Sequence, residues 1–145
     1  MAGTLQLRII TPEGAKFDES ADMVIMRCTT GDMGILPGHE ACSAILGYGA
    51  LRIFSGEAER RMAVFGGIVQ VRDNVVTLLT ESAQWPEDID RAQAEAEREQ
   101  AQRRLQESTD DVEMQKYQVA MRRTLVQIEV SAYPLISKTG AGGPS

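Results

Sequence analysis

Residues 49–67 read "GALRIFSGEAERRMAVFGG", and this stretch decides the fold class. Two runs in which apolar residues recur surround the segment Ser55-Gly56-Glu57. Glycine favours a tight turn because it tolerates positive φ angles, and serine favours one because its hydroxyl bonds to nearby backbone. The stretch therefore predicts two strands joined by a short turn.

The segments on either side of this hairpin repeat the strand pattern. In "LQLRII" (5–10), apolar side chains alternate with polar ones and share one face. "DMVIMRCTT" (22–30) is another β-like run, and "GIVQVRDNVVTLLT" (67–80) contains a tight connection at Asp73-Asn74. Several short strands at this spacing predict an antiparallel β-sandwich or barrel, rather than alternating strands and helices.

The composition changes after residue 82. The segment "AQWPEDIDRAQAEAEREQAQRRLQ" (83–106) has no glycine and is rich in good helix formers. Asp110 and Glu113 have the spacing of a capping box, which marks the start of a second helix. We therefore predict a hairpin of two helices, at 88–106 and 111–130.

Three units follow from this pattern. We predict a β-sandwich domain at 1–84, a helical hairpin domain at 85–131 and a tail at 132–145. The tail contains "SAYPLISKTGAGGPS" (131–145), whose turn and linker composition is typical of disorder.

The contact between the two predicted helices is thin. The second helix carries an apolar stripe formed by Tyr117, Met121, Leu125 and Ile128. The first helix contributes mainly the small side chains of Ala92, Ala96 and Ala101. We expect such a hairpin to be weakly held and able to detach or extend.

Composition excludes several classes of protein. The 145 residues carry a net charge of -6, which argues against nucleic acid as the main partner, since phosphate binding needs a cationic surface. No apolar run approaches the roughly 20 residues of a membrane span, and the first ten residues do not resemble a signal peptide. Cys28 and Cys42 make no disulfide framework, which favours a reducing compartment.

His39, the one histidine of the sequence, invites a catalytic or metal-binding interpretation together with Cys42 and Cys28. Both cysteines lie in apolar runs, however, where a cysteine usually acts as a small buried hydrophobic residue. The glycines Gly66-Gly67 precede a strand instead of a helix, so they do not form a phosphate-binding loop. We expect no catalytic residue, no metal and no cofactor.

Two arginine pairs, Arg103-Arg104 and Arg122-Arg123, lie in the predicted hairpin of this acidic chain. They are typical of a solvated helix face supported by ion pairs. They also fit a local cationic patch that meets an acidic partner. Charge alone leaves both interpretations open.

Three segments of the sequence resemble the epsilon subunit of bacterial F-type ATP synthases, which corresponds to the mitochondrial delta subunit. They are "GDMGILPGHE" (31–40), "FGGIVQV" (65–71) with the following "NVVTLL", and "EDIDRAQAEAEREQAQRRL" (87–105). The first is the most specific, because Gly-acid-x-Gly-Ile-x-Pro-Gly-His is close to a signature of this family. The resemblance spans roughly residues 4–130.

The resemblance implies a ten-stranded antiparallel sandwich followed by a two-helix hairpin, with no catalysis by the chain itself. It implies a place in the rotating central stalk, bound to the gamma subunit and resting on the c-ring, where the subunit couples proton translocation to ATP synthesis. The ring contact falls on Asp32, Met33, Gly34 and His39. The implied location is the cytoplasmic face of the bacterial plasma membrane, as a peripheral subunit.

The resemblance also implies that the hairpin regulates the enzyme. When extended, it reaches the alpha and beta subunits and inhibits ATP hydrolysis, with contacts by Arg122, Arg123, Arg103 and Arg104.

Some family members bind ATP in the folded hairpin through a motif of Ile or Leu, Asp, two variable residues, Arg and Ala. Here Ile89 and Asp90 are kept and Arg123 remains, but Gln93 replaces the arginine of the motif. Because an amide carries no charge for a phosphate, we predict that ATP binding is weak or absent.

Two other functions remain as alternatives. One is a free-standing β-sandwich adaptor whose hairpin binds some other acidic helix. The other is a small enzyme or metal protein that uses His39 with the cysteines.

Overall fold

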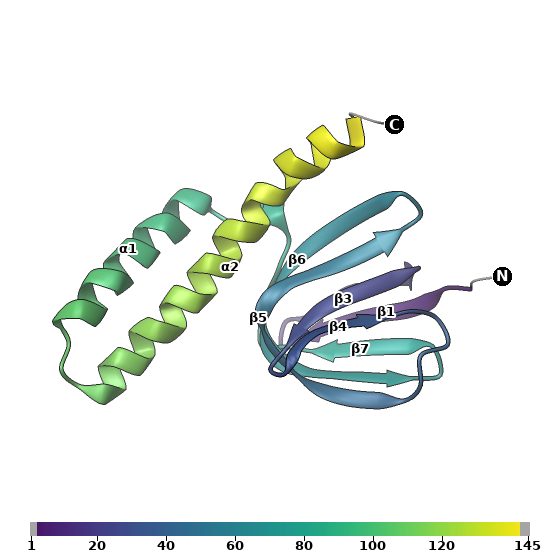
Figure 1. The fold of residues 1–145 in the computed structure, drawn as a ribbon, viewed down its shortest axis with the longest axis horizontal. Coiled ribbons are helices and arrows are strands. Elements are labelled where there is room, and N and C mark those ends of the chain that lie inside the picture. The colour runs from purple at the N-terminus through teal and green to yellow at the C-terminus, as the bar shows by residue number, and fades with distance from the viewer. Residues whose placement is uncertain (1–2, 143–145) are drawn as a thin grey trace.

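The computed structural model describes residues 3–142, with side chains through Tyr133. Its strands are β1 (Leu5–Thr11), β2 (Gly14–Ala21), β3 (Met23–Cys28), β4 (Gly31–Ile35), β5 (Cys42–Ser55), β6 (Ala58–Arg72), β7 (Val75–Leu79) and β8 (Ala83–Gln84). A 3-10 turn at Pro86–Asp88 leads to the helices α1 (Arg91–Glu107) and α2 (Asp111–Gly142). The strands form one body, and the two helices form an antiparallel pair beside it (Figure 1).

The strands pair in the order β2-β1-β7-β6-β5-β3-β4, and β8 adds to β6. All pairs are antiparallel except β1 with β7, in which Leu7 lies opposite Val76. The hairpin predicted from residues 49–67 is the β5–β6 pair, and Ser55 lies opposite Ala58 at its turn. The fold class predicted from the sequence, a β-sandwich followed by a helical hairpin, is confirmed.

The number of strands differs from the predicted ten: the described residues form eight. The reason is that β5 and β6, of 14 and 15 residues, run through both layers of the sandwich without a break. The first half of β6 pairs with β8, and its second half pairs with β7. Between the halves, Gly67 has a φ of +116°, and any Cβ there would clash with the carbonyl oxygen of Leu79. Glycine is required at this bend.

The sandwich core follows from the strand alternation. In β1, every second residue from Leu5 to Thr11 is buried and the residues between them are more exposed. The fully buried side chains come from several strands and include Leu7, Val24, Leu51 and Met62. This is the pattern expected for strands with one face against an apolar core.

The second helix begins at residue 111 as predicted, whereas the first begins at Arg91 and not at 88, because a 3-10 turn occupies Pro86–Asp88. Asp90 caps α1, because its side chain accepts a hydrogen bond from the backbone N–H of Gln93. The predicted end of the second helix near residue 130 is wrong, since α2 continues through residue 142. Residues 132–142, predicted as part of a disordered tail, therefore lie in α2, and residues 143–145 lie outside the described part. The buried Val130 and Tyr133 hold the late turns of this helix against the sandwich.

The faces of the helices also differ from the prediction. In α1 the buried alanines are Ala94 and Ala101, whereas the predicted Ala92 and Ala96 are exposed. In α2 the buried face is formed by Thr124, Val126, Val130 and Tyr133, whereas Leu125 is 45% exposed. The physical reason is that α2 packs against two elements, α1 and the sheet, so no single stripe describes its contacts. Within residues 3–142, neither helix is both long enough and apolar enough to cross a membrane.

Candidate functional site

The loop at 31–40 begins as the edge strand β4. Asp32 lies opposite Arg27 of β3, and 3.3 Å separates its Oδ1 from the arginine Nε. Both side chains are more than half exposed. The ion pair therefore presents a carboxylate at the surface in a defined position.

The apolar residues of this loop divide between core and solvent. Ile35 is buried, and Met33 packs against the sandwich core while remaining partly exposed. Leu36, the next residue, is 57% exposed, because β4 ends before it. Gly34 has room for a side chain, since a Cβ would lie 3.9 Å from Ile25, so the fold does not require glycine there.

His39 takes part in the loop itself. Its backbone N–H donates to the carbonyl oxygen of Leu36, and its ring Nδ1 lies 2.8 Å from the carbonyl oxygen of Glu40. Gly38 adopts a φ of +85°, and its N–H donates to the side-chain oxygen of Asn74. Asn74 belongs to the β6–β7 turn, so a residue 36 positions away shapes the loop. The sequence identified Asn74 as a turn residue but gave no sign of this contact.

The proposed nucleophile or metal site finds little support in the geometry. Cys28 is buried in the core, and burial raises the pKa of its thiol, which disfavours the reactive thiolate. Among the described residues, no three His, Cys, Asp or Glu side chains gather in the way that metal ligands would.

Three exposed apolar side chains form a continuous patch on the sheet, which we call the apolar patch. Ile45, Ile68 and Leu79 lie opposite one another on the neighbouring strands β5, β6 and β7. They are 61%, 41% and 40% exposed. Leu79 also lines an open groove of about 600 Å³ that runs past Tyr48 and Phe65. Sequence alone missed this patch, because it depends on the register of three strands.

The hairpin docks on the sandwich through α2. Val126 and Val130 pack against Ala63 and Phe65 of β6. The Nε2 of Gln127 donates to the Oε1 of Gln84 at 2.9 Å, which adds one polar contact between helix and sheet.

A cavity of about 540 Å³ lies between the hairpin and the sandwich. Its carboxylates come from Glu81, Asp88, Asp90 and Glu97, and Arg123 is the one cation among the described residues that line it. Arg123 is paired with Glu97 across the two helices.

The structure brings two of the three candidate nucleotide-binding residues to this cavity. Asp90 and Arg123 both line it, and Asp90 is already used as the cap of α1. Ile89 packs against the small apolar cluster between α2 and the sheet.

The arginine pairs do not form one cluster. Arg123 faces Glu97, whereas Arg103 lies six residues further along α1, about 9 Å nearer the connection between the helices. Arg103, Arg104 and Arg122 are exposed, and the Arg122 guanidinium lies 5.8 Å from the centre of the Tyr48 ring.

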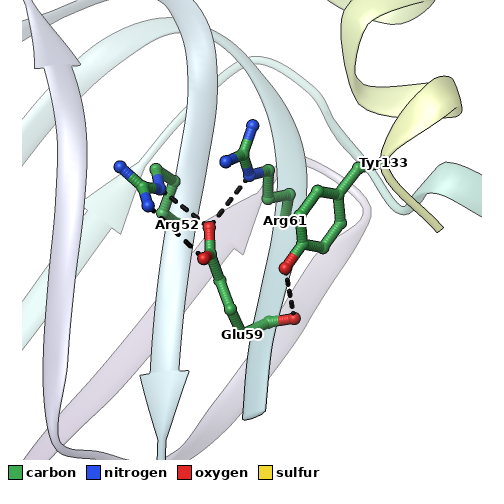
Figure 2. Close-up of polar contacts among 4 residues, drawn as sticks. All are labelled: Arg52, Glu59, Arg61 and Tyr133. Atoms are coloured by element: carbon green, nitrogen blue, oxygen red, sulfur yellow. Dashed lines mark hydrogen bonds and ion pairs between the residues drawn. The ribbon is translucent and has the colours of Figure 1, made fainter. Parts of the chain in front are cut away.

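A second contact between hairpin and sandwich was not foreseen from the sequence. The hydroxyl of Tyr133 donates to the backbone carbonyl of Glu59 at 2.9 Å, and the guanidinium of Arg61 lies 4.4 Å from the centre of the Tyr133 ring (Figure 2). The Glu59 carboxylate accepts hydrogen bonds from both Arg61 and Arg52. Burial opposes the charge of Glu59, but these hydrogen bonds outweigh it and lower the pKa of Glu59.

Comparison with known proteins accounts for this architecture. Residues 4–86 match the family model "ATP synthase, Delta/Epsilon chain, beta-sandwich domain", and residues 87–132 match "ATP synthase, Delta/Epsilon chain, long alpha-helix domain". The chain belongs to the ATP synthase delta/epsilon family. The resemblance inferred from the three sequence segments is thereby confirmed, and as a member of this family the chain is a non-catalytic subunit of ATP synthase.

Individual relatives agree with the family assignment. The chain is 39% identical to the ATP synthase epsilon chain of Bacillus subtilis over 88% of its own length and 97% of the relative's. It is 38% identical to the epsilon chain of Bacillus licheniformis over 88% of this chain and 98% of that one. A chain in the structure of the Euglena gracilis mitochondrial ATP synthase (OSCP, F1 and c-ring) is similar with a TM-score of 0.78 and 25% identity, over 87% of this chain and 79% of that one.

Proposed function

We propose that this chain is a rotor subunit of the central stalk, in which the sandwich binds the gamma subunit and the c-ring and the hairpin restrains ATP hydrolysis. The observation that carries the proposal is the apolar patch, because the sheet exposes three large side chains side by side. Contiguous exposed apolar surface on a folded chain usually marks a protein interface. The subunit would thereby couple proton translocation by the ring to ATP synthesis, as a peripheral subunit on the cytoplasmic face of the bacterial plasma membrane.

Copurification with gamma tests the docking surface. Ile68→Glu places a charge at the centre of the apolar patch, and burying that charge at an interface is costly. We expect gamma to bind at least about tenfold more weakly. Gln70→Glu is the matched control, since Gln70 is exposed two residues further along β6 on the same side of the strand. Equal retention of gamma by both variants would remove the patch from the proposal, and absence of gamma from the wild-type complex would favour the free-standing adaptor.

The loop at 31–40 supports a contact with the ring. Asp32 offers an exposed carboxylate held by Arg27, and Leu36 offers an exposed apolar side chain a few residues away. We propose that Asp32, Met33, Gly34 and His39 face the polar loops of the ring. Substitution of Asp32 or His39 is then expected to weaken assembly or coupling and to leave the fold of the sandwich intact.

The small contact between the hairpin and the sandwich supports an inhibitory role for the hairpin. Two valines supply most of the described apolar contact with the sheet, and each is worth about 1.5–3 kcal/mol when fully buried. When the docked and extended states of the hairpin differ by only a few kcal/mol, a partner that binds the extended state more tightly can shift the population toward it. In the extended state, Arg103, Arg104, Arg122 and Arg123 would meet acidic groups of the alpha and beta subunits.

The acidic cavity supports weak or absent binding of ATP. Four carboxylates line it, and the positive charge of Arg123 is already paired with Glu97. Phosphate groups entering this space would meet net negative charge, which is unfavourable. Calorimetric titration of the isolated chain is expected to give a dissociation constant for ATP above about 1 mM. A submillimolar value would contradict this part of the proposal.

A further inference from the structure

Three consecutive residues of β6 contact both ends of the segment that carries the hairpin. Glu59 and Arg61 contact Tyr133 of α2. Between them, the guanidinium of Arg60 lies 4.0 Å from the centre of the Trp85 ring, directly before the first turn of the hairpin. Successive side chains of a strand point to opposite faces, so one short stretch of β6 serves two different contacts.

The Trp85 contact belongs to the sandwich. The indole packs against the sandwich core, and its ring centre lies 5.8 Å from that of Phe17 in β2. Arg60 also lies over the Phe17 ring, at 5.6 Å. Because side chains of β2 and β6 contact Trp85, we expect any movement of the hairpin to pivot after this residue, in the turn at Pro86–Asp88.

The Tyr133 contact lies far along α2 from that pivot, counted along the chain. The side chain of Tyr133 is buried, and its hydroxyl bonds to a backbone carbonyl that stays with the sandwich. Arg61 is held under the ring by the Glu59 carboxylate, with 2.9 Å between Nε and Oε2. Arg52 bonds to the same carboxylate and so fixes Glu59 from the neighbouring strand. Figure 2 shows the four residues in this arrangement.

We propose that Tyr133 with Glu59, Arg61 and Arg52 forms a latch that holds the hairpin against the sandwich, and that release of the hairpin requires this latch to open. The latch itself does not depend on the proposed inhibitory function, but its effect on hydrolysis rests on that function. The remaining contacts of α2 with the sheet are few: two valines, the Gln127–Gln84 amide pair and Arg122 over the Tyr48 ring. Loss of one specific hydrogen bond therefore changes the docked fraction measurably.

The latch also supports the proposal that the docked state needs no bound nucleotide. Contacts within the chain hold α2 at both ends of its docked segment: Gln127 bonds to Gln84 near the cavity, and Tyr133 bonds to Glu59 beyond it. The Arg123–Glu97 pair joins the helices to each other. The chain thus supplies the contacts that keep the hairpin folded.

Hydrogen exchange of the isolated full-length chain tests the latch. Tyr133→Phe removes the hydroxyl and keeps the ring against Arg61, so the chain still folds. In the limit of rapid reclosing, exchange of α2 amides follows the open population. We expect exchange in residues 124–133 to become about fivefold faster, the change that corresponds to one net hydrogen bond.

Two further variants provide a control and a second test of the latch. Tyr117→Phe is the matched control, because it removes a phenol hydroxyl from the same helix, and no contact of that hydroxyl is described; it is expected to leave exchange unchanged. Arg61→Lys keeps the charge but loses the planar stack on the ring, and it is expected to accelerate exchange as well. Unchanged exchange in Tyr133→Phe would overturn the latch, and unchanged exchange in Arg61→Lys alone would remove Arg61 from it.

Hydrolysis by the assembled enzyme separates the latch from the proposed function. If Tyr133→Phe accelerates exchange and also lowers hydrolysis, both are supported, because release of the hairpin populates the extended state that inhibits. If it accelerates exchange and leaves hydrolysis unchanged, the latch stands and the inhibitory role of the hairpin fails. If exchange is unchanged, the latch fails whatever the effect on hydrolysis.

Discussion

The side-chain oxygen of Asn74 accepts a hydrogen bond from the backbone N–H of Gly38, with 2.6 Å between the two atoms. The contact joins the β6–β7 turn to the loop proposed to face the c-ring. Asn74 also has a φ of +64°, in the left-handed region that asparagine tolerates better than most residues. One residue therefore sets the shape of the turn and of the loop.

Two substitutions at Asn74 separate these roles. Asn74→Asp keeps an acceptor oxygen, whereas Asn74→Gly suits the backbone and removes the acceptor. We expect the glycine variant to be about 1 kcal/mol less stable than the aspartate variant, the usual net value of such a hydrogen bond. Urea denaturation measures the difference, and equal stability of the two variants would mean that the contact does not hold the loop.

The lowered pKa of Glu59 predicts a stability that depends on pH. In the unfolded chain Glu59 titrates near its ordinary value of 4.5, and in the folded chain it titrates lower because Arg52 and Arg61 bond to the carboxylate. Its contribution to stability is therefore complete above pH 4.5 and is lost as the pH falls from 4.5 through the lower folded value.

Glu59→Gln is expected to destabilise the chain by about 1–3 kcal/mol at pH 7, since the hydrogen bonds from Arg52 and Arg61 then go to a neutral amide instead of a carboxylate. The difference from wild type should shrink as the pH falls below 4.5. Denaturation curves at several pH values test this, with Glu57→Gln in the exposed turn as the control. A difference that stays constant with pH would show that the Glu59 charge has no role.

The bend at Gly67 predicts a strong effect of a single methyl group. Gly67→Ala would force a Cβ against the Leu79 carbonyl and within 2.8 Å of the Thr80 Cα, at a φ of +116°. We expect a loss of at least about 3 kcal/mol, or no folded protein. Gly34→Ala is the control and should cost less than about 1 kcal/mol, because the space around it is open. Similar stability of both variants would contradict the requirement for glycine at this bend.

The local patterns of the sequence predicted most of the fold. The turn at Asp73-Asn74 is present, and both residues have positive φ angles. The alternation of "LQLRII" is realised in β1, and Asp110 caps the start of α2 through the N–H of Val112. These features depend on neighbours a few residues apart, which is the range over which sequence patterns carry information.

The contacts between segments that are distant in the chain could not be predicted from the sequence. Thr124 is fully buried although it is polar, because α2 packs against both α1 and the sheet; its hydroxyl bonds to the carbonyls of Ala120 and Met121 within the helix. Tyr133 meets Glu59 across 74 positions of the chain. The apolar patch exists only because the register of β5, β6 and β7 brings its members side by side.

ATP hydrolysis by the assembled enzyme tests the central claim most directly. The comparison is between the wild-type subunit and one lacking residues from 88 onward, with retention of the truncated subunit in the complex verified by its copurification with gamma. The account predicts that the truncated subunit remains bound and that hydrolysis rises, because the sandwich carries the proposed docking surfaces and the hairpin carries the inhibition. Unchanged hydrolysis with the truncated subunit in place would contradict it.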